Sequence, residues 1–211
     1  MDLADFRKEY SSRGLHREDL DPDPVAQFST WFQQAIEVGV NEPNAMTLAT
    51  VDESGMPFQR TVLLKYFDTD GFVFFTNSES RKGRELKANP QACLNFYWMP
   101  LGRQIRISGK VEQVSDAESD AYFAQRRRGS QIASMASDQS RVLESFQHYL
   151  DRVSAMEQEY EGKEVVRPAH WHGWRVIPEA IEFWEEGDYR MHQRELFTRE
   201  KHGWKKVLLY P

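Results

Sequence analysis

The sequence predicts a mainly β, α+β fold, in which an antiparallel barrel, closed or nearly closed, has helices packed outside it. Three observations favour this class. From residue 45 onward, apolar residues recur with a period of two in short runs. Turns that contain Asp or Gly join several of these runs, as in hairpins. Helical periodicity interrupts the succession of strands at only two points.

The first expected element of the domain is a helix. Residues 1–22 are polar and carry Asp-Pro steps near their end, so we expect a mobile arm that leads into the fold. Asp23 suits a helix N-cap with Pro24 at the first helical position, and apolar residues follow at helical spacing as far as Gly39. Residues 23–211 are expected to form a single domain without internal repeats.

Strands and further helices follow in order. A Pro- and Gly-containing turn at residues 99–103 separates two of the strands. Helical patterns predict a short helix at 80–88, a helix at 116–127 and a longer helix at 140–160 with one apolar face. The expected strands cover residues 46–51, 58–67, 72–76, 91–98, 104–114, 174–184, 189–199 and 204–209.

The composition excludes several classes of protein. The chain has 211 residues, 40% of them hydrophobic and 13% aromatic, and a formal net charge of −6. This acidic balance argues against a nucleic-acid partner, which needs an extended basic surface. No segment approaches the ~20 apolar residues that cross a membrane, and the first residues lack a signal-peptide pattern. The single cysteine, Cys93, excludes an intrachain disulfide, so a cytoplasmic location is the simplest expectation.

The segment from Gln59 to Gly83 carries the first candidate site. Arg60 and Lys65 bracket an apolar strand, and a second strand leads into Ser78, which we expect to cap the next helix. A helix start with neighbouring hydroxyl and cationic groups suits a phosphate monoester. The alternative is a capped surface helix with solvated charges.

The spacing of Arg60 and Lys65 raises a difficulty. The two residues are five positions apart, so on a regular strand their side chains point to opposite faces. We expect either a bulge near Leu63 that rotates one of them, or separate groups bound on the two sides of the strand.

A second candidate site is the alternating group Arg190, His192 and Arg194 on the predicted strand at 189–199. Alternation places the three side chains on one face, where their mutual repulsion favours an anionic or electron-rich ligand. The alternative is a solvated edge strand, whose charges discourage aggregation.

A third group, Tyr122, Arg126 and Ser130, recurs at helical spacing and could bind a second phosphate. A helix end with arginines that favour its dipole explains the same spacing. His170 and His172 lack a carboxylate or cysteine partner at ligand spacing, so we expect no metal site. The sequence also lacks the glycine-rich motifs of Rossmann and P-loop phosphate sites.

Taken together, these motifs resemble the pyridoxine (pyridoxamine) 5′-phosphate oxidase family. The resemblance is colinear from Arg7 to Pro211. Its most specific parts are Gln59–Lys65, Phe75-Thr76, Ser80–Lys82, Gln104, Gln139-Ser140, Glu182–Trp184 and the Arg190-x-His192-x-Arg194 motif.

The resemblance implies an FMN-binding split barrel and a homodimer that holds FMN at the subunit interface. It implies oxidation of pyridoxine or pyridoxamine 5′-phosphate to pyridoxal 5′-phosphate, with hydride transfer from substrate C4′ to flavin N5. Oxygen then reoxidises the flavin and gives hydrogen peroxide.

The resemblance also assigns residues to roles. Arg190 and His192 would be catalytic and lie against the substrate ring. The other substrate-binding residues would be Arg7 and Tyr10 of the arm, Lys65, Tyr122, Arg126 and Ser130. The FMN-binding residues would be Arg60, Thr61, Val62, Leu63, Leu64, Lys65, Phe75, Thr76, Arg81, Lys82, Gln104, Gln139, Ser140, Trp184 and Arg194.

The chain departs from the family pattern at a few positions. Met191 and Gln193 stand where the family usually has leucine and aspartate, and Arg127 stands where proline is usual. Two other functions therefore remain as alternatives. One is a related FMN enzyme that acts on another small aromatic, as in phenazine pathways, and the other is a flavin- or pyridoxal-phosphate-binding protein without turnover.

Overall fold

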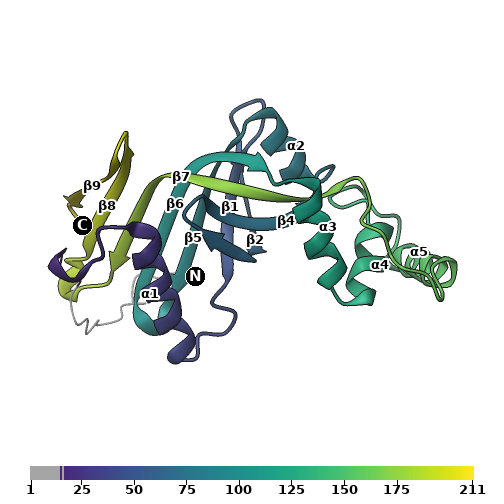
Figure 1. Ribbon diagram of the computed structural model, residues 1–211, viewed down its shortest axis with the longest axis horizontal. Coiled ribbons are helices and arrows are strands. Elements are labelled where there is room, and N and C mark those ends of the chain that lie inside the picture. Colours follow the sequence, from purple (N-terminus) through teal and green to yellow (C-terminus); the bar gives the residue numbers. More distant parts are fainter. Residues whose placement is uncertain (1–14, 16) are drawn as a thin grey trace, which may run out of the picture.

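The computed structural model describes Leu15 and residues 17–211 (Figure 1). Most of the expected arm, including Arg7 and Tyr10, lies outside the described residues. Five α-helices occur in the described part of the chain: α1 (Pro24–Glu37), α2 (Arg81–Ala88), α3 (Asp116–Gln125), α4 (Arg128–Ala136) and α5 (Phe146–Glu159).

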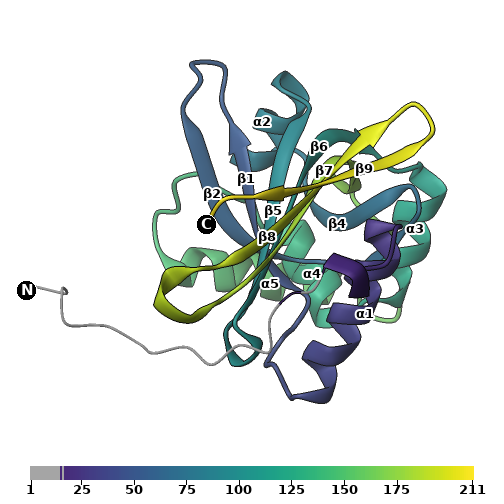
Figure 2. The same ribbon diagram turned by 90° about the vertical axis from the view of Figure 1, so that its left-hand side faces the viewer.

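A single curled antiparallel sheet forms the body of the protein, so the predicted mainly β class is confirmed (Figures 1 and 2). Seven strands follow the order β2-β1-β5-β6-β7-β4-β3, and β8 pairs with β7 and β9. The described strands are β1 (Ala45–Val51), β2 (Pro57–Leu63), β3 (Tyr66–Asp68), β4 (Gly71–Asn77), β5 (Gln91–Trp98), β6 (Arg103–Gln113), β7 (Trp171–Glu185), β8 (Gln193–Glu200) and β9 (Gly203–Leu209).

Helix α1 packs on the main core of the sheet. Its N-cap was predicted correctly, because Asp23 accepts a hydrogen bond from the Val25 N–H at 3.0 Å. Phe28 on this helix is completely buried, and its ring centroid lies 4.9 Å from that of Phe72 and 5.1 Å from that of Phe96. Edge-to-face contacts of this kind add to the stabilisation from buried apolar area.

A second, smaller core lies under α3, α4 and α5. Phe123, Ile132, Val165 and Trp171 are its buried members. Figure 1 shows these helices together at one side of the molecule, whereas β8 and β9 lie at the other. In Figure 2, which views the side of the β8–β9 hairpin, this hairpin stands in front of the rest of the sheet.

The predicted strand at 58–67 is two strands. β2 ends at Leu63 and β3 begins at Tyr66. Between them, the Leu64 N–H donates to Asn44 O, whereas the Lys65 N–H donates to Val73 O. The chain therefore changes partners here, from the side of β1 to β4.

Helix boundaries also differ from prediction in three places. Ser80, not Ser78, caps α2, because the turn closed by the Ser80 N–H on Asn77 O delays the helix start. Extended backbone at Arg126 and Arg127 divides the predicted helix after residue 116 into α3 and α4. The helix predicted from residue 140 begins only at Phe146, after the Ser145 cap.

The predicted strand at 189–199 begins late, so the prediction of three alternating cationic side chains on one strand face is wrong. Tyr189 and Arg190 have positive φ angles of 55° and 65° and lie in a 3-10 turn. Pairing with β7 starts only at Gln193 opposite Glu185. The residues before it reverse the chain between the antiparallel strands β7 and β8, so only Arg194 of the three lies on a strand.

Candidate active site

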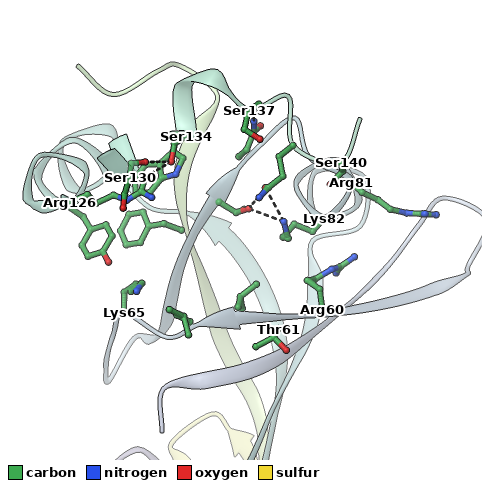
Figure 3. Close-up of a pocket in the computed structure, with 18 of the residues that line it drawn as sticks. Arg60, Thr61, Lys65, Arg81, Lys82, Arg126, Ser130, Ser134, Ser137 and Ser140 are labelled. Atoms are coloured by element: carbon green, nitrogen blue, oxygen red, sulfur yellow. Dashed lines mark hydrogen bonds between the residues drawn. The ribbon is translucent and has the colours of Figure 1, made fainter. Parts of the chain in front are cut away.

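A cleft in the described part of the chain has a volume of about 1000 Å³. Edge strand β2, strand β4, helices α2, α3 and α4 and the segment after α4 contribute to its walls (Figure 3). Of the residues that the resemblance assigns, it brings together Arg60, Thr61, Val62, Leu63, Lys65, Phe75, Thr76, Arg81, Lys82, Tyr122, Arg126, Ser130, Gln139 and Ser140.

Lys82 marks one end of the cleft. Its buried ammonium donates to Thr76 Oγ1 and to Gln139 Oε1, both at 3.1 Å. Burial, with the neighbouring charge of Arg60, lowers the pKa of Lys82 to about 8, and the Glu85 carboxylate acts in the opposite direction. The direct acceptors are uncharged oxygens, so an anion in the cleft would stabilise the ammonium form.

Two arginines lie at the same end. Arg60 of β2 donates to the Glu85 carboxylate at 2.9 Å, and Arg81 of α2 donates to it at 3.0 Å. The Arg81 guanidinium also lies over the Phe58 ring, 3.4 Å from its centroid. With Lys82, these side chains form a cationic group that we call the α2 end of the cleft.

Arg126 marks the opposite end. Its Nη1 donates to Ser134 Oγ at 2.7 Å, and its guanidinium lies 4.8 Å from the centroid of the Trp171 ring. Burial lowers its pKa, although arginine stays charged at physiological pH. Ser130 and Ser134 lie beside it in Figure 3, and we call this region the α4 end.

Aromatic rings line the wall near the α4 end. Phe75 stacks on Tyr122 with centroids 4.1 Å apart and on Trp171 at 5.0 Å. The interplanar angles of these two contacts are 13° and 12°, so the three rings are nearly parallel. The stack brings together residues from β4, α3 and β7, and it offers a flat apolar surface beside the cations.

The structure resolves the spacing problem of Arg60 and Lys65. The register of β2 with β1 is continuous from Pro57 to Leu63, so the expected bulge near Leu63 is absent from this pairing. Because β2 ends at Leu63, Lys65 lies beyond the strand and the alternation of strand faces does not apply to it. The side chains of Arg60 and Lys65 therefore line the same cleft. Figure 3 places Arg60 toward the α2 end and Lys65 toward the α4 end.

Several assigned residues lie elsewhere. The Leu64 side chain is buried in the main core. Five others do not belong to the cleft lining of the described chain but gather around β7 and β8, and we call them the β7–β8 corner: Gln104, Trp184, Arg190, His192 and Arg194.

Strand register and ring contacts hold the β7–β8 corner together. Gln104 and Arg194 lie opposite Trp184 on its two neighbouring strands. The His192 ring lies 4.6 Å from the Trp184 ring, and Arg194 donates to the buried Glu182 at 2.8 Å. Arg190 is exposed in the turn before β8.

Sequence reasoning missed several residues of the cleft. Phe58 could have been found, because it lies on the same edge strand as the candidate segment that starts at Gln59. Ser134 follows Ser130 by one helical turn, but the predicted helix boundaries hid this relation. No local pattern marks the others. The missed residues are Phe58, Arg127, Ser134, Ser137 and Trp171, whereas Gln59 and Asn77 lie in the candidate segment but were assigned no individual role.

Two further findings concern the described part of the chain. It contains no cluster of three or more His, Cys, Asp or Glu residues that could hold a metal ion. One ring nitrogen of His172 instead lies 2.7 Å from Ala169 O and the other 3.3 Å from Arg167. None of the helices described has the length and apolar character needed to cross a membrane.

Known protein families and individual relatives match nearly the whole chain. Residues 32–160 match a family model described as pyridoxamine 5′-phosphate oxidase. Residues 171–211 match one described as the pyridoxine 5′-phosphate oxidase C-terminal dimerisation region. The chain is 50% identical to pyridoxine/pyridoxamine 5′-phosphate oxidase of Rubrobacter xylanophilus, with 100% of this chain and 97% of the relative covered. It is 49% identical to the enzyme of the same name from a Nostoc species, with coverage of 99% and 98%.

Two solved structures are similar to this chain. PhzG from Burkholderia lata, in complex with tetrahydrophenazine-1-carboxylic acid, is 30% identical with a TM-score of 0.89 over 96% of this chain and all of that one. An FMN-binding protein from Nostoc punctiforme related to pyridoxamine 5′-phosphate oxidase is 16% identical with a TM-score of 0.70, over 89% and 98% of the two chains, and supports the fold alone. By its two family models and its full-length relatives, the chain belongs to the pyridoxine/pyridoxamine 5′-phosphate oxidase family.

Proposed function

We propose that the protein is an FMN-dependent oxidase that converts pyridoxine or pyridoxamine 5′-phosphate to pyridoxal 5′-phosphate. The observation that carries this proposal is the presence of two cationic groups at opposite ends of one cleft, on a chain with net charge −6. FMN and the vitamer each carry one phosphate. Two phosphates at the two ends would leave the flavin and the substrate ring between them, close enough to react.

FMN fits the α2 end. The buried Lys82 ammonium has uncharged hydrogen-bond acceptors and a lowered pKa, which an FMN phosphate would raise again. Arg60 and Arg81 would add charge-assisted hydrogen bonds to this phosphate. When bound, FMN supplies hydride acceptance at N5 and reoxidation by oxygen, which yields hydrogen peroxide.

The vitamer phosphate fits the α4 end. Arg126 and the hydroxyls of Tyr122 and Ser130 would hold it there, and Lys65 would lie between the two ligands. The aromatic stack around Phe75 limits the movement of Tyr122 and Arg126. This arrangement would orient the substrate, while its ring points toward the middle of the cleft.

The β7–β8 corner would complete the site from a second copy of the chain. The residues of this corner do not line the cleft of their own chain. All of them except Gln104 fall within residues 171–211, which match the dimerisation-region model. A homodimer with FMN at the interface would place Gln104, Trp184 and Arg194 against the flavin and Arg190 and His192 against the substrate. The covering role of Arg7 and Tyr10, the single domain at 23–211 and the cytoplasmic location belong to the same proposal.

The affinity for FMN is expected to fall as the pH rises above 8. The free protein loses the Lys82 proton near this pH, whereas bound phosphate favours the protonated form. Affinity should therefore be highest below the lowered pKa and decline by up to about tenfold per pH unit above it. Flavin fluorescence titrations between pH 7 and 9.5 measure this decline. Lys82→Arg, which keeps its charge throughout, should show a flat profile, and a flat profile for the unchanged protein would contradict the role of Lys82.

Purified protein with FMN and pyridoxine 5′-phosphate in air tests the proposed reaction. We expect pyridoxal 5′-phosphate and hydrogen peroxide in equal amounts. Bound yellow flavin without either product would falsify the oxidase function and favour a binding protein.

A second candidate function is oxidation of another small aromatic by bound FMN. The likeness to the Burkholderia lata structure with its bound tetrahydrophenazine carboxylic acid favours this candidate. Arg126 at the α4 end, with Lys65 toward it, speaks for a phosphorylated substrate instead. Turnover of pyridoxine 5′-phosphate and none of unphosphorylated pyridoxine would support the phosphate assignment.

A further inference from the structure

We propose that Glu85 is a positioning residue for the FMN phosphate, because it holds Arg60 and Arg81 together at the α2 end of the cleft. This inference rests on the proposed function. Glu85 itself does not line the cleft, and it acts through the two arginines that do.

The contacts of Glu85 join three elements. One carboxylate oxygen accepts from Thr50 Oγ1 of β1 at 2.5 Å and from Arg60 of β2 at 2.9 Å. The other accepts from Arg81 Nε, one turn earlier on α2, at 3.0 Å. The Glu85 side chain is only 4% exposed, so these bonds are shielded from water. Charge-assisted hydrogen bonds in such surroundings fix geometry more firmly than exposed ones.

Both arginines keep donors for a ligand. Arg81 uses only its Nε–H for Glu85, and the Phe58 ring covers its guanidinium at 3.4 Å. Its two terminal nitrogens therefore remain available for an incoming phosphate, in the planar arrangement that suits paired contacts. Arg60 lines the cleft and spends one N–H of each terminal nitrogen on Thr50 and Glu85, which leaves three of its five N–H donors outside these two bonds.

The carboxylate also balances charge at this end. Burial raises the pKa of Glu85, but hydrogen bonds from Thr50, Arg60 and Arg81 outweigh that effect, so the group stays ionised. Its negative charge raises the pKa of Lys82, against burial and the repulsion from Arg60. Loss of this charge should therefore move the deprotonation of Lys82 to lower pH.

A role confined to stability is the competing explanation, since Glu85 also ties α2 to the sheet. The two roles differ in what they change. If Glu85 only stabilised the fold, its loss would lower the unfolding temperature and change the affinities for FMN and riboflavin equally. A positioning residue alters the recognition of phosphate, which FMN has and riboflavin lacks.

The test is Glu85→Gln, with Glu79→Gln as the matched control. Glu79 precedes α2, is exposed and pairs with Lys87 at 2.6 Å. Dissociation constants for FMN and riboflavin are measured by flavin fluorescence from pH 6.5 to 9.5. For Glu85→Gln we expect the preference for FMN over riboflavin to fall about 10- to 100-fold, with riboflavin binding unchanged. We also expect the pH midpoint of FMN binding to shift to lower pH, and Glu79→Gln should change neither quantity.

An unchanged FMN preference and an unchanged midpoint in Glu85→Gln would overturn the proposal. If that variant does not fold, Thr50→Val removes the hydrogen bond that Thr50 donates to the carboxylate and the one that it accepts from Arg60, without changing any charge. It should lower the FMN preference several-fold, and an unchanged preference would again overturn the proposal. A wild-type protein that does not prefer FMN to riboflavin would contradict the proposed function itself, and the role of Glu85 with it.

Discussion

Arg190→Ala is expected to lower kcat for pyridoxine 5′-phosphate by about 100- to 1000-fold, the usual cost of removing one group that stabilises charge at the reacting centre. FMN should remain bound, because Arg190 is assigned to the substrate. The substitution leaves the backbone strain nearly unchanged, since both residues carry a Cβ and meet the positive φ of 65° in the same way. A loss of activity would therefore report the guanidinium and not the turn.

Steady-state kinetics and the flavin content of the purified variant measure these two effects. Lys201→Ala is a suitable control, because Lys201 is an exposed cation in the turn between β8 and β9. The control should retain full activity. A kcat of Arg190→Ala within about threefold of the wild-type value would remove Arg190 from the reacting centre, since a group that stabilises the transition state costs far more.

Phe28→Ala is expected to lower the free energy of unfolding by about 3–5 kcal/mol, as found for large cavities left by aromatic residues. Phe28 is completely buried, and its ring contacts rings from β3, β4 and β5 as well as α1. Its removal would leave a void between α1 and the sheet that these rings cannot fill without strain.

Chemical denaturation of the flavin-free protein measures the stability change. Phe146→Ala is the matched control, because Phe146 is 68% exposed at the start of α5. Its stability change should stay below about 1 kcal/mol. A loss below about 1.5 kcal/mol for Phe28→Ala would show that the core around this ring repacks, contrary to its close contacts.

The sequence predicted those parts of the fold that local patterns encode. Asp23 and Pro24 mark the start of α1 because capping depends on neighbouring residues only. The strands β5 and β6 follow from alternation, which buries one face of each against the core. These signals are readable in one stretch of chain, so their elements were placed within a residue or two.

Other features depend on contacts between distant segments, and alternation misplaced them. Arg190 follows a strand-like pattern, but the need to reverse the chain between β7 and β8 imposes positive φ angles there. Lys65 faces the same cleft as Arg60 because the backbone after Leu63 leaves β1 and the Lys65 N–H donates a hydrogen bond to Val73 O of β4. Neither pairing partner can be read from the segment itself.

Some residues of the candidate site were likewise predicted from the sequence, and others were not. Resemblance supplied most residues of the cleft, including Lys82 and Arg126, although their charges alone fitted a solvated helix end equally well. Trp171 was missed because it joins the stack from a strand about fifty residues beyond Tyr122. Its contact with the other two rings depends on the tertiary fold, and the spacing of residues along the sequence does not predict it.

A mixed dimer tests most directly the claim that two subunits share each site. One subunit carries Arg126→Ala in the α4 end of its cleft, and the other carries Arg190→Ala in its β7–β8 corner. Two affinity tags allow the mixed dimer to be isolated from both parents. It contains one site with both substitutions and one with neither. We expect about half of the wild-type turnover per dimer, while each parent dimer is nearly inactive. Turnover no higher than that of the parents would contradict a shared site, because it would place both arginines in the same subunit's active site.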